Sequence, residues 1–431
     1  MSGRVVIVGR PNVGKSTLFN RIVGKRKSIV EDTPGVTRDT IEVTVQWAGK
    51  EFIIVDTGGL VTDTHEDILR KVKETVEKEI DKADLILFVV SARDGVTPLD
   101  KDIARILEPY RAKVLLVVNK ADTQRDEESA LEFYELGYEK LYILSAIHRK
   151  GVGELLDYIV DTLPEEPSSY ANEGIKVALV GRPNVGKSSI VNSLLGRERV
   201  IVSPIAGTTR DAVEVPFRWK GKDFLLVDTA GLRRRSRVDY GIEFFSVGRS
   251  LKAIELCDVA CLVLDASEGV TRQDKRIGGL IERRHKGCVI VANKMDMCSL
   301  SEEEVKRRIR EELFFLDYAP LVLTVATTGE GMQALLEQVI KVYSDYTRQH
   351  RTSFVNRSVR KILTEKPLYH KGKAVKVYYA FQEGIKPPSV VIITNFPDAW
   401  KDNYRRFFTK RLRELLNIRN SPLKLTVKGR E

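Results

Sequence analysis

The eight residues GRPNVGKS occur twice in this chain, at Gly9–Ser16 and again at Gly181–Ser188. Each copy follows a short apolar run and precedes a helical stretch, STLFNRIVG in the first and SSIVNSLLG in the second. A glycine-rich loop between a strand and a helix turns backbone amides and a helix N-terminus toward an anion, so this pattern predicts a phosphate-binding loop. Either one copy is a decayed scaffold, or both copies bind phosphate.

The duplication extends well beyond these loops. PGVTRDTIEV from Pro34 matches AGTTRDAVEV from Ala206, and EFIIVDTGGL from Glu51 matches DFLLVDTAGL from Asp223. Within each copy, short β-branched apolar runs alternate with charged helical stretches. This pattern is typical of βα units built around a mostly parallel sheet.

Repeat and composition together divide the chain into four parts. We expect a first phosphate-binding domain at 1–163, a Pro- and Ser-containing linker at 164–174, a second such domain at 175–348 and a basic domain at 349–431. Residues 351–431 hold 19 Lys and Arg against 6 Asp and Glu, whereas the whole chain has a net charge of +11. The entire basic excess therefore lies in the last domain, which favours a polyanionic partner.

The rest of the composition argues against several classes of protein. The longest apolar runs, such as LILFVV at Leu85–Val90, are too short to span a bilayer, and MSGRVVIVGR leaves no room for a signal peptide. Four cysteines without CxxC spacing indicate reduced, mostly core thiols, and five scattered histidines give no zinc-binding pattern. We expect a cytoplasmic protein.

Two further pairs of motifs close apolar strands. DTGG at Asp56–Gly59 and DTAG at Asp228–Gly231 place an aspartate where it can hold Mg²⁺ through water, and a glycine amide where it can sense a γ-phosphate. NKAD at Asn119–Asp122 and NKMD at Asn293–Asp296 offer a carboxylate that accepts both the ring NH and the exocyclic amine of guanine. Adenine lacks this donor pair, so the motifs favour GTP over ATP.

A third pair differs between the copies. SAIHRKG at Ser145–Gly151 suits a loop whose backbone contacts the base, but the second copy reads VATTGEG at Val325–Gly331. Ala146 corresponds to Ala326, while the serine hydroxyl is lost. If the backbone carries the contact, little changes; otherwise the second site binds the base less well.

The segments after each loop carry candidate switch residues. Thr37 in GVTRD and Thr209 in GTTRD can close over Mg²⁺ when a γ-phosphate is present and release it after hydrolysis. RRRSR at Arg233–Arg237 directly follows DTAGL, where the first copy has the acidic VTDTHED. We expect a nucleotide-dependent contact there, although charge runs are usually only solvated, and we expect the two switches to meet different partners.

This set of motifs resembles that of the Era-like GTPases. The tandem copies with a basic C-terminal domain resemble the Der (EngA) family of double-Era-like bacterial GTPases, over nearly the whole chain. The resemblance implies an α/β fold with two tandem P-loop GTPase domains and a small α+β KH-like C-terminal domain. It further implies a GTPase that binds the large ribosomal subunit and rRNA and acts in assembly of that subunit. From the motifs we expect GTP and GDP as ligands and Mg²⁺ as cofactor, and we expect a monomer.

The C-terminal residues follow an α-β-β-α-β order that fits such a domain. We expect a helix at Val359–Leu363, strands at Ala374–Gln382 and Pro388–Asn395, an amphipathic helix at Tyr404–Leu416 and a last strand at Leu423–Lys428. The GXXG loop of ordinary KH domains is missing, since HKGK has one glycine, so sequence-specific reading of single strands is not expected. Docking on folded RNA and docking on the second GTPase domain both remain open.

Catalysis must differ from the Ras type, which places a Gln after DxxG to orient water. Here Leu60 and Leu232 stand at that position. The family resemblance implies that Asn12 and Asn184 hold a potassium ion near the β- and γ-phosphates, in the role of an arginine finger. The alternative is a structural Asn that stabilises the loop turn.

The expected site is large and nearly symmetric between the copies. The nucleotide-binding set is Gly9, Arg10, Pro11, Asn12, Val13, Gly14, Lys15, Ser16, Asp56, Thr57, Gly58, Gly59, Leu60, Asn119, Lys120, Ala121, Asp122, Ser145 and Ala146, with Gly181, Arg182, Pro183, Asn184, Val185, Gly186, Lys187, Ser188, Asp228, Thr229, Ala230, Gly231, Leu232, Asn293, Lys294, Met295, Asp296 and Ala326 in the second copy. Within it, Mg²⁺ ligands are Ser16, Thr37, Asp56, Ser188, Thr209 and Asp228, potassium ligands are Asn12 and Asn184, and catalytic residues are Lys15, Lys187, Asn12 and Asn184.

Two other functions compete with the GTPase reading. A nucleotide-regulated RNA-binding module would use the same motifs with incidental hydrolysis, and turnover with and without ribosomal subunits separates the two. A partner GTPase in tRNA modification would need a reactive C-terminal cysteine, and none follows Cys298.

Overall fold

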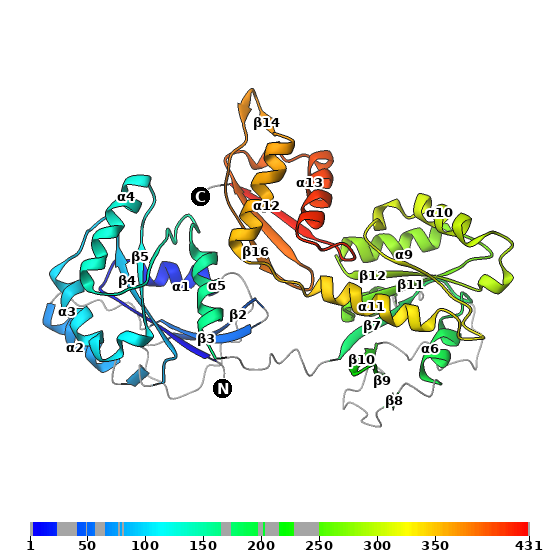
Figure 1. Ribbon diagram of the computed structural model, residues 1–431, viewed down its shortest axis with the longest axis horizontal. Coiled ribbons are helices and arrows are strands. Elements are labelled where there is room, and N and C mark those ends of the chain that lie inside the picture. Colours follow the sequence, from blue (N-terminus) through cyan, green and yellow to red (C-terminus); the bar gives the residue numbers. More distant parts are fainter. Residues whose placement is uncertain are drawn as a thin grey trace.

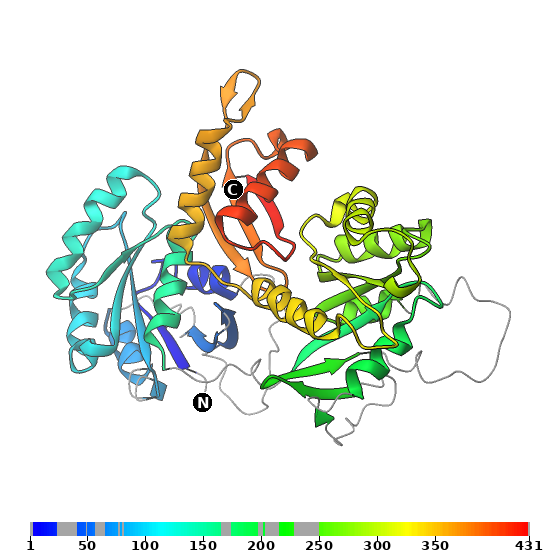
Figure 2. The same ribbon diagram turned by 45° about the vertical axis from the view of Figure 1, so that its right-hand side comes forward.

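The computed structural model describes residues 3–23, 41–48, 50–56, 65–75, 78–79, 82–164, 174–196, 201–202, 215–227 and 250–429. Two mostly parallel sheets with flanking helices confirm the expected tandem α/β fold, and a smaller α+β domain lies between them (Figure 1, Figure 2). We call these the first repeat, the second repeat and the C-terminal domain. Within the described ranges, no helix has the length and apolar character needed to cross a membrane.

The sheet of the first repeat has the strand order β2-β3-β1-β4-β5-β6. Among these described strands, β2 and β3 pair antiparallel and all other neighbours pair parallel. Helices α1 and α5 cover one face and α2 and α3 the other, so β4 is buried along its whole length, as expected for a parallel strand covered on both faces. The elements are β1 (Gly3–Val8), α1 (Lys15–Val23), β2 (Ile41–Trp47), β3 (Lys50–Asp56), α2 (His65–Thr75), β4 (Leu85–Ser91), α3 (Pro98–Leu107), β5 (Val114–Asn119), α4 (Gln124–Ser129), β6 (Leu141–Ile143) and α5 (Val152–Thr162).

The second repeat has the same topology with one added edge strand, in the order β13-β12-β11-β7-β10-β9-β8. Helices α6 and α11 pack on one face and α9 and α10 on the other. The elements are β7 (Ile175–Val180), α6 (Lys187–Leu195), β8 (Ile201–Val202), β9 (Val215–Trp219), β10 (Lys222–Leu226), β11 (Val259–Asp265), α9 (Arg272–Arg283), β12 (Gly287–Asn293), α10 (Glu302–Glu312), β13 (Leu321–Leu323) and α11 (Met332–Tyr346).

The C-terminal domain is a three-stranded sheet, β16-β17-β18, with helices α12 and α13 packed on one face. The strand expected at 374–382 starts later than predicted. Lys371 and Gly372 adopt φ values of 48° and 76°, which suit a two-residue hairpin turn, so Ala374 pairs back with Tyr369. The elements are α12 (Thr352–Glu365), β14 (Tyr369–His370), β15 (Lys373–Ala374), β16 (Val377–Gly384), β17 (Ser389–Thr394), α13 (Asp402–Leu415) and β18 (Lys424–Gly429).

The other face of this sheet packs on the first repeat. Four residues of the C-terminal domain, Tyr379, Phe381, Val391 and Ile393, belong to the same apolar cluster as the core of the first repeat. Asp157 of α5 accepts hydrogen bonds from the Trp47 indole and from the backbone amide of Thr352, both at 2.8 Å. The first repeat and the C-terminal domain therefore share one continuous core.

Ion pairs join the C-terminal domain to the second repeat as well. Arg413 pairs with Asp317 at 3.0 Å, and Lys386 pairs with Asp258 at 3.2 Å. Asp345, at the end of α11, accepts a hydrogen bond from the backbone amide of Asn420 at 2.9 Å. The C-terminal domain thus bridges the two repeats.

Candidate nucleotide-binding sites

Both phosphate loops adopt the conformation that their glycines permit. Gly14 and Gly186 have φ values of 94° and 97°. A Cβ on Gly14 would lie 2.4 Å from Nδ2 of Asn119, and one on Gly186 would lie 2.2 Å from Nδ2 of Asn293. No larger residue fits at either position, because the loop lies directly against the strand that carries the NKxD motif.

The loop lysines are folded onto their own loops. Nζ of Lys15 donates to the carbonyls of the first two loop residues at 2.8 and 2.9 Å, and Lys187 does the same at 2.8 and 2.6 Å. Burial lowers the pKa of each ammonium to about 8. Each ammonium is therefore already held at the loop, where a bound phosphate would provide a negatively charged partner for it.

The loop arginines have acidic partners in both repeats. Arg10 pairs with Asp94 at 2.7 Å and with Asp100 at 3.3 Å. Asp100 is fully buried and forms a capping box with Thr97 at the start of α3, and the second repeat has the same box at α9. In the second repeat Arg182 pairs with Glu268 at 2.7 Å. Arg10 and Arg182 therefore anchor the phosphate loops to the helix after the next strand.

The first repeat also places two candidate Mg²⁺ ligands next to the phosphate loop. Ser16 is exposed in the first turn of α1, and Asp56 is buried at the end of β3. Asp56 lies in register with Ile7, two residues before the phosphate loop. A hydroxyl and a carboxylate are the hard oxygen ligands that Mg²⁺ prefers, so these residues fit the ion. In the second repeat Ser188 occupies the corresponding helix position, and Asp228 lies outside the described residues.

The NKxD asparagines connect the loops of each site. Nδ2 of Asn119 donates to the carbonyl of Val13 at 2.9 Å, and Oδ1 accepts from the amide of Ala146 at 3.0 Å. The second repeat has both bonds around Asn293, at 2.9 and 3.1 Å. The base-side loop, which is Ser145–Gly151 in the first repeat and Val325–Gly331 in the second, therefore makes the same backbone contacts in both repeats, despite the change from Ser145 to Val325.

The serine hydroxyl does have a separate role in the first repeat. Oγ of Ser145 donates to Oδ1 of Asp122 at 2.5 Å. Val325 cannot make this bond, and the hydroxyl of the preceding Thr324 donates instead to Oδ1 of Asn293 at 3.1 Å. The replacement thus leaves the carboxylate of Asp296 without the orienting hydroxyl that Asp122 has.

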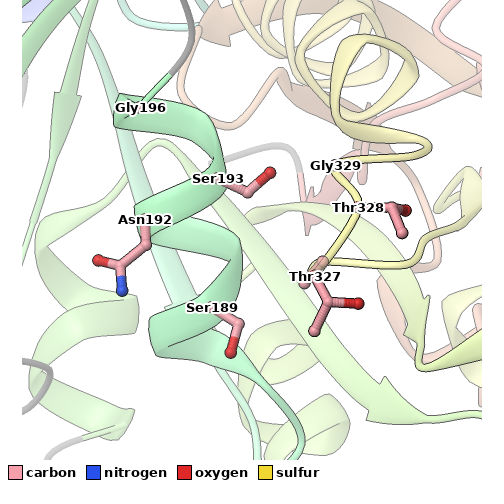
Figure 3. Close-up of a pocket in the computed structure, with 8 residues that line it drawn as sticks. Ser189, Asn192, Ser193, Gly196, Thr327, Thr328 and Gly329 are labelled. Atoms are coloured by element: carbon pink, nitrogen blue, oxygen red, sulfur yellow. The ribbon is translucent and has the colours of Figure 1, made fainter.

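A polar pocket of about 400 Å³ lies between α6 and the base-side loop of the second repeat (Figure 3). It is lined by Ser189, Asn192, Ser193 and Gly196 from the helix side and by Ala326, Thr327, Thr328 and Gly329 from the loop. In the first repeat Arg21 stands at the position of Ser193. Its guanidinium donates to the carbonyls of Ala146 and Ile147, both at 3.1 Å, and so ties helix to loop.

Part of the expected site lies outside the described residues. These positions are Thr37, Thr57, Gly58, Gly59 and Leu60 in the first repeat, and Thr209, Asp228, Thr229, Ala230, Gly231, Leu232 and the Arg233–Arg237 run in the second. The described members of each set, namely the phosphate loop, the NKxD motif and the base-side loop, meet at the carboxyl ends of the parallel strands, where ligands of such sheets bind.

Sequence reasoning missed the residues that make the two sites different. Arg21 and Arg93 in the first repeat are replaced by Ser193 and Ser267 in the second, and Ser91 is replaced by Asp265. An alignment of the two repeats, position by position, would have shown these exchanges. Their contacts could not have been predicted without the folded arrangement.

Comparison with known proteins shows which protein family this chain belongs to. A family model described as "50S ribosome-binding GTPase" matches residues 4–120 and 176–294, and one described as "KH-domain-like of EngA bacterial GTPase enzymes, C-terminal" matches 349–428. The chain is 68% identical to the GTPase Der of Aquifex aeolicus over the full length of both proteins. The chain belongs to the Der family. A Der from Sulfurihydrogenibium is 48% identical over 99% of this chain and 98% of that protein.

Membership in the Der family makes this chain a GTPase that binds GTP and GDP, with the Mg²⁺ dependence usual for such enzymes. Among solved structures, Era in complex with MgGDPNP and a segment of 16S ribosomal RNA aligns with 60% of this chain and 94% of its own length. The sequence identity there is 23% and the TM-score 0.31.

Proposed function

We propose that this Der-family GTPase is a nucleotide-controlled switch in assembly of the large ribosomal subunit, and that it binds the subunit or its rRNA according to the nucleotide state. The observation that carries the proposal is the placement of charge. Residues 351–431 hold 19 basic against 6 acidic side chains, on a domain that contacts both repeats. The description of the matching family model as a 50S ribosome-binding GTPase supports the same partner. Action on ribosome assembly implies a cytoplasmic protein, and we expect a monomer.

The basic residues of the C-terminal domain differ in their surroundings, and two pairs of them illustrate the difference. Arg413 and Lys386 pair with acidic residues of the second repeat and hold the domains together. Lys371 and Lys373, on the exposed β14–β15 hairpin that projects from the molecule (Figure 1), make no ion pair within the described ranges. Next to them, Tyr369 is 64% exposed. This hairpin offers cations for phosphates and a ring for stacking.

The sheet of this domain is not available for reading bases in the described arrangement. One face carries α12 and α13, and the other is buried against the first repeat. Together with the missing GXXG loop, this favours contact with the phosphate backbone of folded RNA through the hairpin and helices rather than sequence-specific reading of a single strand.

Each repeat supplies its own nucleotide site in this proposal. Lys15 and Lys187 contact the β- and γ-phosphates. Asp122 and Asp296 accept the guanine donors. Ser16 and Asp56 in the first repeat, and Ser188 with Asp228 in the second, hold Mg²⁺, which when bound neutralises charge on the phosphates. These residues orient the γ-phosphate for in-line attack by water.

For hydrolysis, we propose that Asn12 and Asn184 hold a potassium ion beside the phosphates. Both have a φ of 64°, a left-handed conformation that Asn tolerates better than most residues. This left-handed conformation by itself accounts for the presence of Asn. The proposal of a bound potassium ion therefore rests on the absence of a Gln after DxxG and on the family resemblance. The test is the response of GTP turnover to potassium.

The rival function is a nucleotide-regulated RNA-binding module in which hydrolysis is incidental. Turnover of GTP by the full chain, measured with and without purified large subunits, distinguishes the two. We expect the subunits to accelerate turnover. An unchanged rate, with the subunits bound, would favour the rival.

The hairpin is tested by a double variant, Lys371→Ala with Lys373→Ala. It should weaken binding to large subunits and flatten its salt dependence by about two ions, because each lysine that contacts a phosphate releases roughly one counterion. Lys306→Ala is a matched control, since Lys306 is an exposed lysine of α10 that pairs with Glu302 of its own helix. Equal losses in both variants would remove the hairpin from the interface.

A further inference from the structure

The two guanine pockets differ in the charges around their NKxD carboxylates. In the first repeat Nη2 of Arg93 lies 2.6 Å from Oδ2 of Asp122, and Nε2 of His148 lies 3.9 Å from Oδ1. The side chain of Asp122 is 8% exposed. With the bond from Ser145, each carboxylate oxygen already has a donor.

The second repeat has a different pairing. Asp296 is exposed, and within the described residues it has no ion pair or hydrogen bond to its side chain. The cation of its motif, Lys294, instead pairs with Asp265 at 2.6 Å, and Ser267 donates to the same carboxylate at 2.6 Å. Ser267 stands where the first repeat has Arg93, and Asp265 where it has Ser91. The exchange thus leaves the carboxylate of Asp296 open to a ligand.

We propose that Arg93 determines the guanine affinity of the first site by competing with the base for the carboxylate of Asp122. Guanine presents two donors, the ring NH and the exocyclic amine, and each donates to one oxygen of the carboxylate. Arg93 already uses part of the acceptor capacity of Oδ2, so guanine at the first site has to share this oxygen with an ion pair that the second site lacks. The inference rests on the proposed role of Asp122 as the guanine acceptor.

Arg21 is a second arginine at the first nucleotide site and serves as a comparison for Arg93. Its guanidinium donates to two backbone carbonyls, which are not ligands of guanine, and braces α1 against the base-side loop. Loss of Arg21 loosens the site without freeing Asp122. The two arginines therefore act in opposite directions on nucleotide affinity.

The test measures GDP affinity of the first site by calorimetry, in full-length protein in which Lys187→Ala removes binding at the second site. Arg93→Ser should tighten GDP binding about two- to fivefold, the range for a partly exposed ion pair. Arg21→Ser should weaken it. Because the side chain of Arg93 is 58% exposed, its replacement leaves the core intact, and thermal melting checks this.

The reciprocal exchange needs two substitutions. A lone arginine at position 267 would be captured by Asp265, so Asp265→Ser is combined with Ser267→Arg, in a background in which Lys15→Ala silences the first site. This variant should bind GDP more weakly than its parent.

Salt provides a further test of the Arg93 ion pair. The ratio of GDP affinities between Arg93→Ser and its parent should approach one as NaCl rises, because salt screens the ion pair.

Unchanged or weaker GDP binding in Arg93→Ser would overturn the proposal, as would a ratio that does not respond to salt. Asp122→Asn separates this failure from a wrong base assignment. If Asp122→Asn lowers GDP affinity while Arg93→Ser does not raise it, only the competition is refuted. If Asp122→Asn also has no effect, the assignment of the guanine pocket fails with it.

Discussion

Nδ2 of Asn119 donates a hydrogen bond to the carbonyl of Val13 across 2.9 Å, and so fixes the phosphate loop to the strand that carries the base-binding motif. Asn119→Ala removes this bond and the one to Ala146, and leaves buried backbone groups unpaired. Each costs about 1–3 kcal/mol. We expect the cost of one of them to appear in binding, so GDP affinity of the first site should fall roughly five- to a hundredfold. Calorimetry measures the loss, and Asn293→Ala should affect only the second site. Full affinity in a folded Asn119→Ala protein would contradict this role.

Guanine selectivity provides a second test. Asp122→Asn and Asp296→Asn reverse the hydrogen-bond polarity at the base, so each should lower GTP affinity of its own site by more than roughly a hundredfold and allow xanthosine nucleotides to bind. Competition between GTP and XTP at each site measures the switch. If Asp296→Asn keeps full GTP affinity at the second site, that pocket is assigned wrongly.

The loop lysines predict a specific pH dependence. Burial lowers the pKa of Lys15 to about 8, below the 10.5 of an unfolded lysine. Between these values the unfolded chain binds more protons, so the free energy of unfolding of the nucleotide-free protein rises with pH.

Bound phosphate favours the charged ammonium, so GDP binding above pH 8 should take up about one proton per site, and affinity should fall as the pH rises further. Calorimetry at pH 9 in two buffers of different ionisation enthalpy measures the uptake. Lys15→Ala should remove one of two equivalents of bound nucleotide together with its proton. GDP binding without proton uptake would contradict the lowered pKa of Lys15.

Potassium should accelerate hydrolysis, by less than the roughly thousandfold that an arginine finger supplies. A monovalent cation held by Asn12 or Asn184 would stabilise charge that develops between the β- and γ-phosphates. Steady-state turnover in KCl and in NaCl at equal ionic strength measures the effect, and Asn12→Ala and Asn184→Ala should each remove the response of one site. Equal rates in both salts would reject the ion and direct attention to a residue supplied by the ribosome.

The sequence alone predicted the α/β fold class of the two repeats, because both carry strong local signals. GRPNVGKS predicts the strand–loop–helix unit, and the helix expected at Tyr404–Leu416 matches α13 (Asp402–Leu415) to within two residues at each end. The hairpin before β16 was missed, since its signal is only a two-residue turn at Lys371 and Gly372, just before the strand expected at 374–382.

The contacts that distinguish the two sites depend on long-range geometry. Arg93 and Asp122 lie 29 positions apart and meet only because β4 and β5 are neighbours in the sheet. Burial of the C-terminal sheet against Trp47 of the first repeat likewise joins residues more than 300 positions apart. No periodicity or motif in the sequence indicates such contacts, so the difference between the two sites could be recognised only from the structure.

The central claim is that the nucleotide state controls binding of the large ribosomal subunit. Its most direct test is co-sedimentation of the full chain with purified large and small subunits in the presence of GDP or of a non-hydrolysable GTP analogue. We expect the protein to sediment with the large subunit in the presence of the analogue and to be released by GDP. Equal binding in both nucleotides, or binding to neither subunit, would contradict the claim.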